Sequence, residues 1–210
     1  KLNQEQLTQL VNEVIDVHAK EVSYLGSSPL VMPEKEWTGE QRKEFQARRR
    51  TIWRARQSLE YKMSAYTELA DEFVRRIYAE AEQRFPDEAQ TVALAATGSY
   101  ARREMIQVSD IEGRIVVSDP DKIPQARQFI YYALQGIFGQ EWQPVKVDEV
   151  VKMKGDDKEL EVATRLLEMR YIAGNGKVFA ARKQKFQEQL DREYKDFALV
   201  YIRSWNVHYQ

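Results

Sequence analysis

The segment from 91 to 118 constrains the fold of this chain more than any other. It contains an apolar stretch from Thr91 to Ala96, a Gly-Ser turn, and two carboxylates, Asp110 and Glu112, just before a second apolar stretch. Residues two apart point to the same face of a β-strand, so both carboxylates are expected on one face. Carboxylates directed at one point repel each other unless a cation lies between them. The spacing therefore predicts a divalent metal site.

The Gly98-Ser99 turn supplies the second half of a predicted nucleotide and metal site. Oxygen ligands suit Mg²⁺ or Mn²⁺, and Mg²⁺ is commonly held by one or two carboxylates together with substrate phosphates. Gly98 lets the backbone approach a polyphosphate, and Ser99 offers a hydroxyl and an N–H at the start of a predicted short helix. The alternative is an ordinary turn followed by an Asp-x-Glu pair on a solvated strand edge.

These residues resemble the signature of the nucleotidyltransferase superfamily, which is Gly-[Gly/Ser], a spacer, and Asp-hydrophobic-[Asp/Glu]. The matching positions are Gly98, Ser99, Asp110, Ile111 and Glu112. Arg102 and Glu104 match an Arg-x-Glu motif, and Ser109 precedes the carboxylates. This pattern is similar to the branch of the glutamine-synthetase adenylyltransferases, the uridylyltransferases of the nitrogen-regulatory signal protein, and a related group of predicted nucleotidyltransferases.

Two downstream segments extend the resemblance to about residues 91 to 190. Residues 144–148 resemble the strand that carries the third metal-site carboxylate of the adenylyltransferases, here Asp148. Residues 164–175 resemble their helix ending in Ala-Arg-x-x-Ala-Gly-Asp. The segments occur in the order that the family has.

Three departures from the family pattern leave an alternative open, a catalytically inactive module that keeps the fold for regulation or interaction. Gly113 stands where the family has an apolar strand residue, and Glu112 replaces the usual Asp. Lys146 and Glu149 replace the arginines that flank the third carboxylate. Each departure leaves a carboxylate site in place.

The resemblance implies transfer of a nucleoside monophosphate from a nucleoside triphosphate to a hydroxyl, with release of pyrophosphate. It implies a protein as acceptor, with transfer to a small molecule or an RNA end as the alternative. The implied catalytic residues and ligands of Mg²⁺ or Mn²⁺ are Asp110, Glu112 and Asp148. The implied nucleotide-phosphate-binding residues are Gly98, Ser99, Arg102 and Ser109. For Arg102 the alternative is an ion pair with Glu104 that braces the short helix against the sheet.

A basic stretch lies earlier in the chain. It consists of Arg42, Lys43, Arg48, Arg49, Arg50, Arg54 and Arg56. On a helix these side chains could bind RNA phosphates while Phe45 and Trp53 stack on bases. Because acidic residues follow closely, we favour a solvated helix face with Phe45, Ile52 and Trp53 turned inward.

Composition excludes several other classes of protein. The chain has no cysteine and only two histidines, at opposite ends, so disulfides, thiolate catalysis and histidine-based metal sites are not expected. The net charge of −1 does not indicate nucleic acid as the main partner. No run approaches the about 20 apolar residues of a membrane span, so we expect a cytoplasmic protein without a membrane partner. Because Lys1 rather than Met begins the chain, we expect a larger parent protein.

The pattern along the chain predicts an α+β fold, a nucleotidyltransferase-type mixed β-sheet flanked by helices. The predicted helices are 3–23, 41–84 with a bend or break near 58–64, 100–107, 122–138, 157–173 and a last helix from 177; the predicted strands are 91–96, 112–118 and 143–152. Thr38 and Gln41 are predicted to form the capping box of the second helix. We expect an α-helical N-terminal extension over 1–88 and a nucleotidyltransferase-fold domain with C-terminal helices over 89–210.

Overall fold

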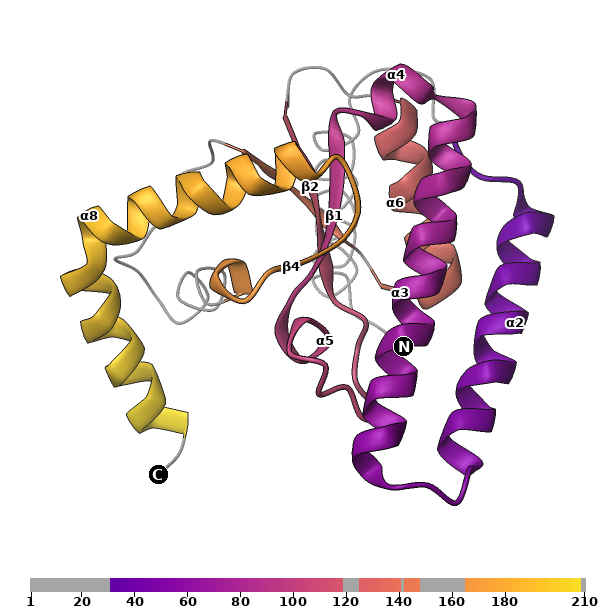
Figure 1. Cartoon of the computed structure of the whole chain (residues 1–210), viewed down its shortest axis with the longest axis horizontal. Coiled ribbons are helices and arrows are strands. Elements are labelled where there is room, and N and C mark those ends of the chain that lie inside the picture. Colours follow the sequence, from indigo (N-terminus) through magenta and orange to yellow (C-terminus); the bar gives the residue numbers. More distant parts are fainter. Residues whose placement is uncertain (1–30, 119–124, 141, 148–164, 209–210) are drawn as a thin grey trace, which may run out of the picture.

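A computed structural model describes residues 31–118, 125–140, 142–147 and 165–208 of the chain. The predicted first helix and Asp148 lie outside the described residues. The elements are α2 (Lys35–Arg54), α3 (Leu59–Arg84), α4 (Pro86–Ala89), β1 (Val92–Ala96), α5 (Gly98–Ala101), β2 (Gly113–Val117), α6 (Gln125–Phe138), β3 (Gln143–Lys146), β4 (Arg170–Gly174) and α8 (Gly176–His208). Figure 1 shows the α+β fold that the sequence predicts, which confirms the fold class.

The four strands form one mixed sheet in the order β3-β2-β1-β4. Strand β1 is antiparallel to both β2 and β4, whereas β2 and β3 run parallel. Ala96 at the end of β1 pairs with Gly113 at the start of β2. The predicted site therefore lies where β1 ends and β2 begins.

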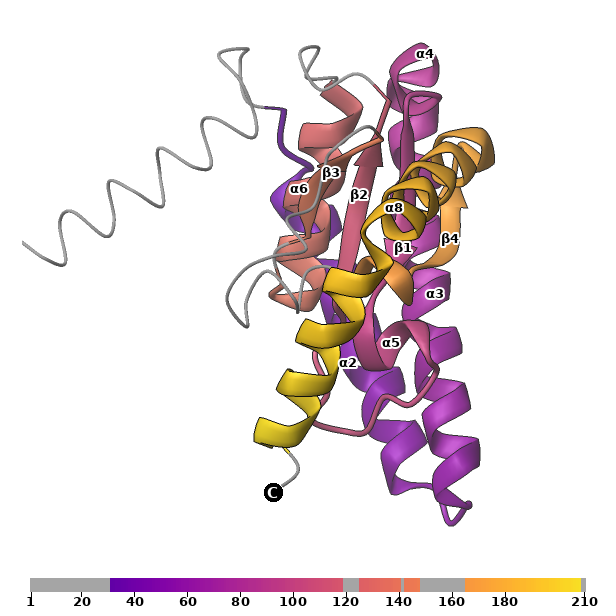
Figure 2. The ribbon, with the colours of Figure 1, turned by 90° about the vertical axis from the view of Figure 1, so that its left-hand side faces the viewer.

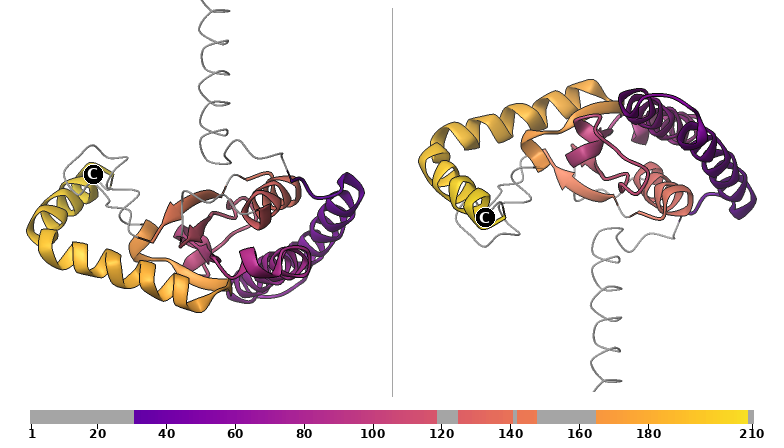
Figure 3. Two further views of the ribbon diagram at one scale, coloured as in Figure 1. Left: turned by 90° about the horizontal axis from the view of Figure 1, so that it is seen from above. Right: turned by 90° about the horizontal axis from the view of Figure 1, so that it is seen from below.

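Helices cover both faces of this sheet, as Figures 1 and 2 show, and the two views of Figure 3 show the strands between the two helical layers. Val92, Leu94 and Ala96 of β1 belong to a core shared with α2, α3 and α6. Ala93 and Ala95 pack in a second, smaller cluster with residues of α8. Because β1 is buried on both faces, its sequence is apolar throughout rather than alternating.

The long predicted helix divides into α2 and α3 between Arg54 and Leu59. The hydroxyl of Ser58 accepts a hydrogen bond of 3.2 Å from the amide of Tyr61 and so caps α3. The predicted capping box at Thr38 is wrong, because α2 already begins at Lys35. Thr38 lies inside the helix, where its methyl group packs against Gly136 of α6: a Cβ added to Gly136 would lie 2.3 Å from it.

Two predicted helices also need correction. Helix α5 ends at Ala101 instead of 107, because Arg103 takes a left-handed conformation (φ 62°) and the amide of Glu104 returns to the carbonyl of Ser99. Residues 170–173, predicted as the end of a helix, belong to strand β4 (Arg170–Gly174). Pairing with β4 satisfies the backbone groups along the other edge of β1, a long-range requirement that overrides local helix preference.

Arg170 joins three elements through one guanidinium. It makes a bidentate ion pair with Asp71 of α3, with N···O distances of 2.8 and 3.0 Å. It also donates hydrogen bonds to the carbonyls of Ala101 (3.2 Å) and Tyr100 (3.3 Å) at the end of α5. The Asp71 side chain is 2% exposed. Burial lowers the pKa of Arg170, but the hydrogen bonds and charge of Asp71 outweigh burial and leave this pKa raised. Arg170 thus has a structural role that links β4, α3 and α5.

Gly113 is explained by packing. A Cβ at this position would lie 2.5 Å from the ring of Trp142 and 2.6 Å from the carbonyl oxygen of Ala95. The buried Trp142 indole donates to the carbonyl of Ile111 at 2.8 Å. Trp142 therefore fills the space that an apolar side chain at 113 would take, and the departure from the family pattern is compensated in the core.

The core of α2, α3 and α6 continues without interruption into β1 and β2. The division into 1–88 and 89–210 stays a prediction.

Replacing Arg170 with Met is expected to lower the free energy of unfolding by about 3–5 kcal/mol, since it leaves the buried Asp71 carboxylate without its main partner. Urea unfolding measures this change. The matched control is Lys185→Met, which removes an exposed ion pair with Glu188 and should leave stability nearly unchanged. A loss as small as that of the control would contradict the role given to Arg170. The double variant Arg170→Met/Asp71→Leu should recover part of the loss.

Candidate functional site

The candidate site begins one residue beyond the paired ends of β1 and β2. The amide of Thr97 donates to the carbonyl of Glu112 at 3.0 Å, which continues the antiparallel pairing past Ala96 and Gly113. Residues directly opposite each other on neighbouring strands share a face. The side chains of Thr97 and Glu112 therefore lie on one face of the sheet, the face that α8 covers.

Burial alternates along the segment that carries the two carboxylates. Ile111 and Ile115 are buried in the core, whereas Asp110 is exposed and Glu112 is half-buried. This segment is not part of β2, which begins at Gly113, but it keeps the alternation of an extended chain. Asp110 and Glu112 are thus both turned away from the core.

Gly98 brings the turn next to Glu112. Its φ of +58° is a conformation that glycine adopts without strain, and a Cβ here would lie 3.3 Å from Glu112 Oε2. A larger residue would crowd the carboxylate as well as strain the turn. The structure thus brings together the glycine turn and one predicted ligand, which stand 14 positions apart in the sequence.

Each of the two carboxylates has a polar partner. The amide of Gln140 donates to Asp110 Oδ1 at 2.8 Å, and Arg165 lies 3.3 Å from Glu112 Oε1. Burial raises the pKa of Tyr66, with the guanidinium of Arg49 acting against this rise and the charge of Asp110 adding to it. Gln140 and Arg165 thus lie beside the two predicted ligands, and Asp110 also interacts with the buried Tyr66.

Two predicted phosphate-binding residues have other contacts. Arg102 donates to Glu104 at 2.8 Å and to Glu168 at 2.5 Å. The hydrogen bond that Arg102 donates to Glu104 is the main cause of the raised pKa of Arg102. The hydroxyl of Ser109 accepts from the amide of Ile106 at 2.9 Å and closes a turn. These contacts favour the bracing alternative for Arg102.

The donor set fits a divalent cation that also binds phosphate. Within the described residues no three His, Cys, Asp or Glu side chains come together. Asp148, the third predicted ligand, lies outside those residues. Two carboxylates with accessible oxygens nevertheless match the usual protein share of a Mg²⁺ site, in which substrate phosphates complete the shell.

Thr97 is a site residue that the sequence motif did not single out. It is fully buried, and its hydroxyl has no hydrogen-bond partner within the described part of the chain. Its place opposite Glu112 makes it a donor available to the carboxylate or to a ligand beside it. In the sequence, the position of Thr97 directly before the glycine turn is the feature that could have indicated a role in the site.

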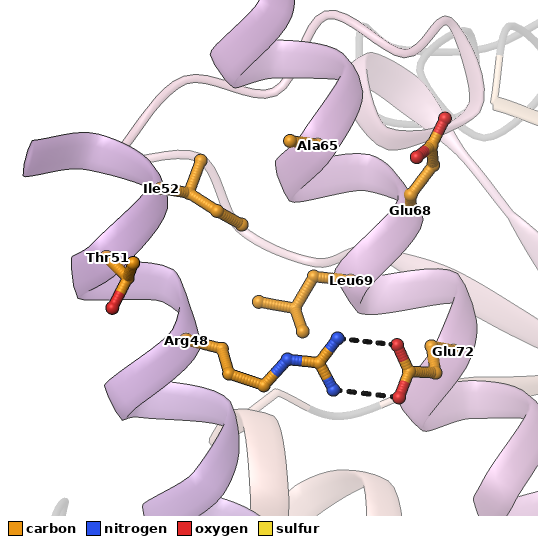
Figure 4. A pocket seen from close by; sticks show the side chains of 7 residues that line it. All are labelled: Arg48, Thr51, Ile52, Ala65, Glu68, Leu69 and Glu72. Carbon is orange, nitrogen blue, oxygen red and sulfur yellow. Dashed lines mark hydrogen bonds and ion pairs between the residues drawn. The ribbon is translucent and has the colours of Figure 1, made fainter. Parts of the chain in front are cut away.

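The apolar side chains of the basic stretch face the core. Phe45 is buried, and Ile52 and Trp53 pack against the core, as predicted. A pocket of about 360 Å³ lies between α2 and α3, away from the predicted site residues; Figure 4 shows the two hydrogen bonds from Arg48 to Glu72 at its edge. Arg48, the arginine of the basic stretch that lines this pocket, is therefore already paired with Glu72.

Thr97→Val is expected to raise the free energy of unfolding by about 1 kcal/mol, because it removes a buried hydroxyl without a partner and keeps its shape. Thermal or urea unfolding measures the change. Thr67→Val is the matched control: Thr67 is also buried, but its hydroxyl donates to the carbonyl of Met63 at 2.9 Å, so this variant should lose about 1 kcal/mol. Equal losses in both variants would show that Thr97 has a partner.

Comparison with known proteins finds similarity over the part of the chain that carries these residues. Residues 43–136 match the model of the family described as "Putative nucleotidyltransferase DUF294", a match that includes the glycine turn and both carboxylates. The chain is also similar to the "Bifunctional uridylyltransferase/uridylyl-removing enzyme" of Haemophilus influenzae (strain 86-028NP), with 28% identity over 137 residues. That similarity covers 56% of this chain and 16% of the relative, so the chain spans a small part of the relative's length. Among the described residues, no helix combines the length and apolar character that a bilayer crossing needs.

Proposed function

Because this chain is related to the nucleotidyltransferases, we propose that it transfers a nucleoside monophosphate from a nucleoside triphosphate to a hydroxyl and releases pyrophosphate. The observation that carries the proposal is the closeness of the Gly98 turn to the Glu112 carboxylate, whose Oε2 would lie 3.3 Å from a Cβ added at Gly98. A triphosphate beside this turn would lie next to the ligand of a divalent cation. That juxtaposition is what nucleotidyl transfer requires, since the reaction depends mainly on positioning and charge neutralisation.

The roles of the residues follow from their chemistry. Asp110 and Glu112, with Asp148, would hold Mg²⁺ or Mn²⁺. The bound ions would neutralise charge on the triphosphate and lower the pKa of the acceptor hydroxyl. Gly98 leaves room for the phosphates. The proton of the acceptor hydroxyl would pass to the one of these three carboxylates that lies nearest to it. Ser99 and Ser109 are proposed to contact the phosphates through their hydroxyl groups.

A protein hydroxyl is the proposed acceptor, in the cytoplasm. Support comes from the resemblance to the adenylyltransferases and uridylyltransferases, and from the relative whose name includes uridylyl transfer. The pairing of Arg48 and Arg49 within the fold argues against an RNA end as acceptor: Arg48 binds Glu72, and Arg49 donates to the carbonyl of Gln107.

Asp110→Asn is expected to lower transfer at least a hundredfold, since it removes the charge of a proposed ligand while keeping the hydrogen-bonding shape. The assay incubates the protein with Mn²⁺, a nucleotide-depleted extract and each of the four triphosphates labelled at the α-phosphate. Label in protein, in RNA and in small molecules is then counted separately, together with released pyrophosphate.

The matched control is Asp191→Asn. Asp191 is also exposed and also accepts a 2.8 Å hydrogen bond from a glutamine amide, that of Gln187, but it lies on α8. This variant should transfer at the parent rate. Equal rates in the parent, Asp110→Asn and Asp191→Asn would contradict the proposed site, and absence of Mn²⁺-dependent nucleotide binding in the parent would support the inactive module instead.

A further inference from the structure

The turn between α5 and β2 presents two apolar side chains to solvent. Ile106 is 45% exposed and Val108 is 80% exposed, the largest exposed fraction among the large apolar side chains that the structure describes. Turns are usually built from Gly, Pro, Asn, Asp and Ser, which adopt the required backbone angles or bond to the backbone. Ile106 and Val108 are therefore not needed to form the turn, and they leave apolar surface in water.

Both ends of this turn are fixed in the core. Met105 comes directly before Ile106 and is fully buried, and Ile111, after the turn, is buried in the same cluster. The hydroxyl of Ser109 accepts a hydrogen bond of 2.9 Å from the amide of Ile106 and closes the turn between these two residues. The exposed side chains thus belong to a short segment, residues 106–109, whose two ends are held by burial.

Helix α2 holds the middle of the 106–109 turn. The guanidinium of Arg49 donates a hydrogen bond to the carbonyl of Gln107, and it lies 5.3 Å from the centre of the Tyr66 ring on α3. Figure 1 shows the segment between α5 and β2 beside the N-terminal half of α3. Because α2 and α3 support the turn, Ile106 and Val108 form part of a defined surface.

This surface adjoins the proposed catalytic carboxylates. Asp110 follows Val108 by two positions, so their Cα atoms are at most about 7 Å apart in any backbone conformation. The Asp110 side chain is exposed as well. An acceptor hydroxyl that reaches a cation on Asp110 therefore brings the residues on either side of that hydroxyl to the 106–109 turn.

The chemistry of the turn favours an apolar segment of a protein as its partner. Residues 106–109 are Ile-Gln-Val-Ser and carry no charge. Nucleic acid is bound through positive charges that neutralise its phosphates, and the arginine that contacts the turn, Arg49, already donates to the carbonyl of Gln107. Apolar side chains gain free energy when a partner removes them from water, and exposed apolar groups beside a polar site are typical of protein-binding surfaces.

We propose that the 106–109 turn binds the protein acceptor, with Ile106 and Val108 packing against apolar side chains that flank the acceptor hydroxyl. This inference rests on the proposed function and adds the class of sequence that the enzyme modifies. The turn supplies affinity for the acceptor, whereas other residues hold the cation and the nucleotide. Loss of its apolar side chains therefore raises the KM for the acceptor and leaves nucleotide binding unchanged.

The test uses two synthetic peptide libraries with Tyr, Ser or Thr at the central position. Leu and Val flank the hydroxyl in one library, and Ser and Gln flank it in the other. Label from the α-phosphate of each triphosphate is counted in the peptides in the presence of Mn²⁺. The parent should use the apolar library with a KM about five- to tenfold lower than that of the polar library, since burial of one or two side chains of this size corresponds to that ratio.

Val108→Ser and Ile106→Ser should each remove most of this preference, while calorimetry should find parent-like binding of a non-hydrolysable triphosphate with Mn²⁺. Val108→Leu, which keeps an apolar side chain, should retain the preference. The matched control is Met32→Ser: Met32 is 60% exposed, but it follows Val31, whose amide donates to Gln128 on α6. This control should behave as the parent does, and circular dichroism checks that each variant is folded.

A parent-like preference in folded Val108→Ser and Ile106→Ser would overturn this inference and leave the proposed function intact. Equal use of both libraries by the parent, or label in extract protein but in neither library, would overturn it in the same way. Loss of self-association in the serine variants by size-exclusion chromatography, with an unchanged KM, would assign the turn to contact between two copies of the chain instead. If the parent transfers no label to any acceptor, the proposed function fails and this inference fails with it.

Discussion

The ion pair between Arg170 and Asp71 is the interaction on which the rest of the structure depends. It links β4 to α3, and the same guanidinium donates hydrogen bonds to the carbonyls of Tyr100 and Ala101 at the end of α5. Because α5 begins at Gly98, this pair also fixes where the glycine turn lies relative to β2. A buried pair of this kind contributes more to a unique arrangement than to net stability, since desolvation offsets most of the attraction. The Gly98 turn therefore owes its position to a residue 72 positions later in the chain.

The site contrasts with this fixed centre. Asp110 and Glu112 face away from the core and have exposed or half-exposed partners, Gln140 and Arg165. Glu112 and its partner Arg165 are 34% and 28% exposed, whereas the Asp71 side chain is 2% exposed, so a ligand can reach the first pair more readily than Asp71. Thr97 adds a buried hydroxyl opposite Glu112 that makes no hydrogen bond to the described residues. The site thus places accessible polar groups on a fixed scaffold, an arrangement that suits ligand binding.

The features that could be predicted from the sequence are those that neighbouring residues determine. The strand before Gly98 and the carboxylates after it were predictable, because glycine turns and two-residue alternation are local properties. Strand β4 was not, since residues 170–174 pair with β1 only after the chain has folded back. The capping signal at Thr38 did not mark the start of α2, because Thr38 lies inside the helix and packs against Gly136, almost a hundred positions away. Gly113 departs from the family pattern because the ring of Trp142 fills the space of its side chain, a contact between distant positions. The pairing of Glu112 with Arg165 also has no local signal in the sequence.

The most direct measurement is a crystal structure of the protein with Mn²⁺ and a non-hydrolysable triphosphate, using anomalous scattering to locate the metal. A manganese peak between Asp110 and Glu112, with phosphate oxygens beside Gly98, is the predicted result. A triphosphate bound elsewhere, such as the pocket between α2 and α3, with Glu112 still paired to Arg165 and no manganese beside it, would contradict the assignment of this turn and these carboxylates as the nucleotide site.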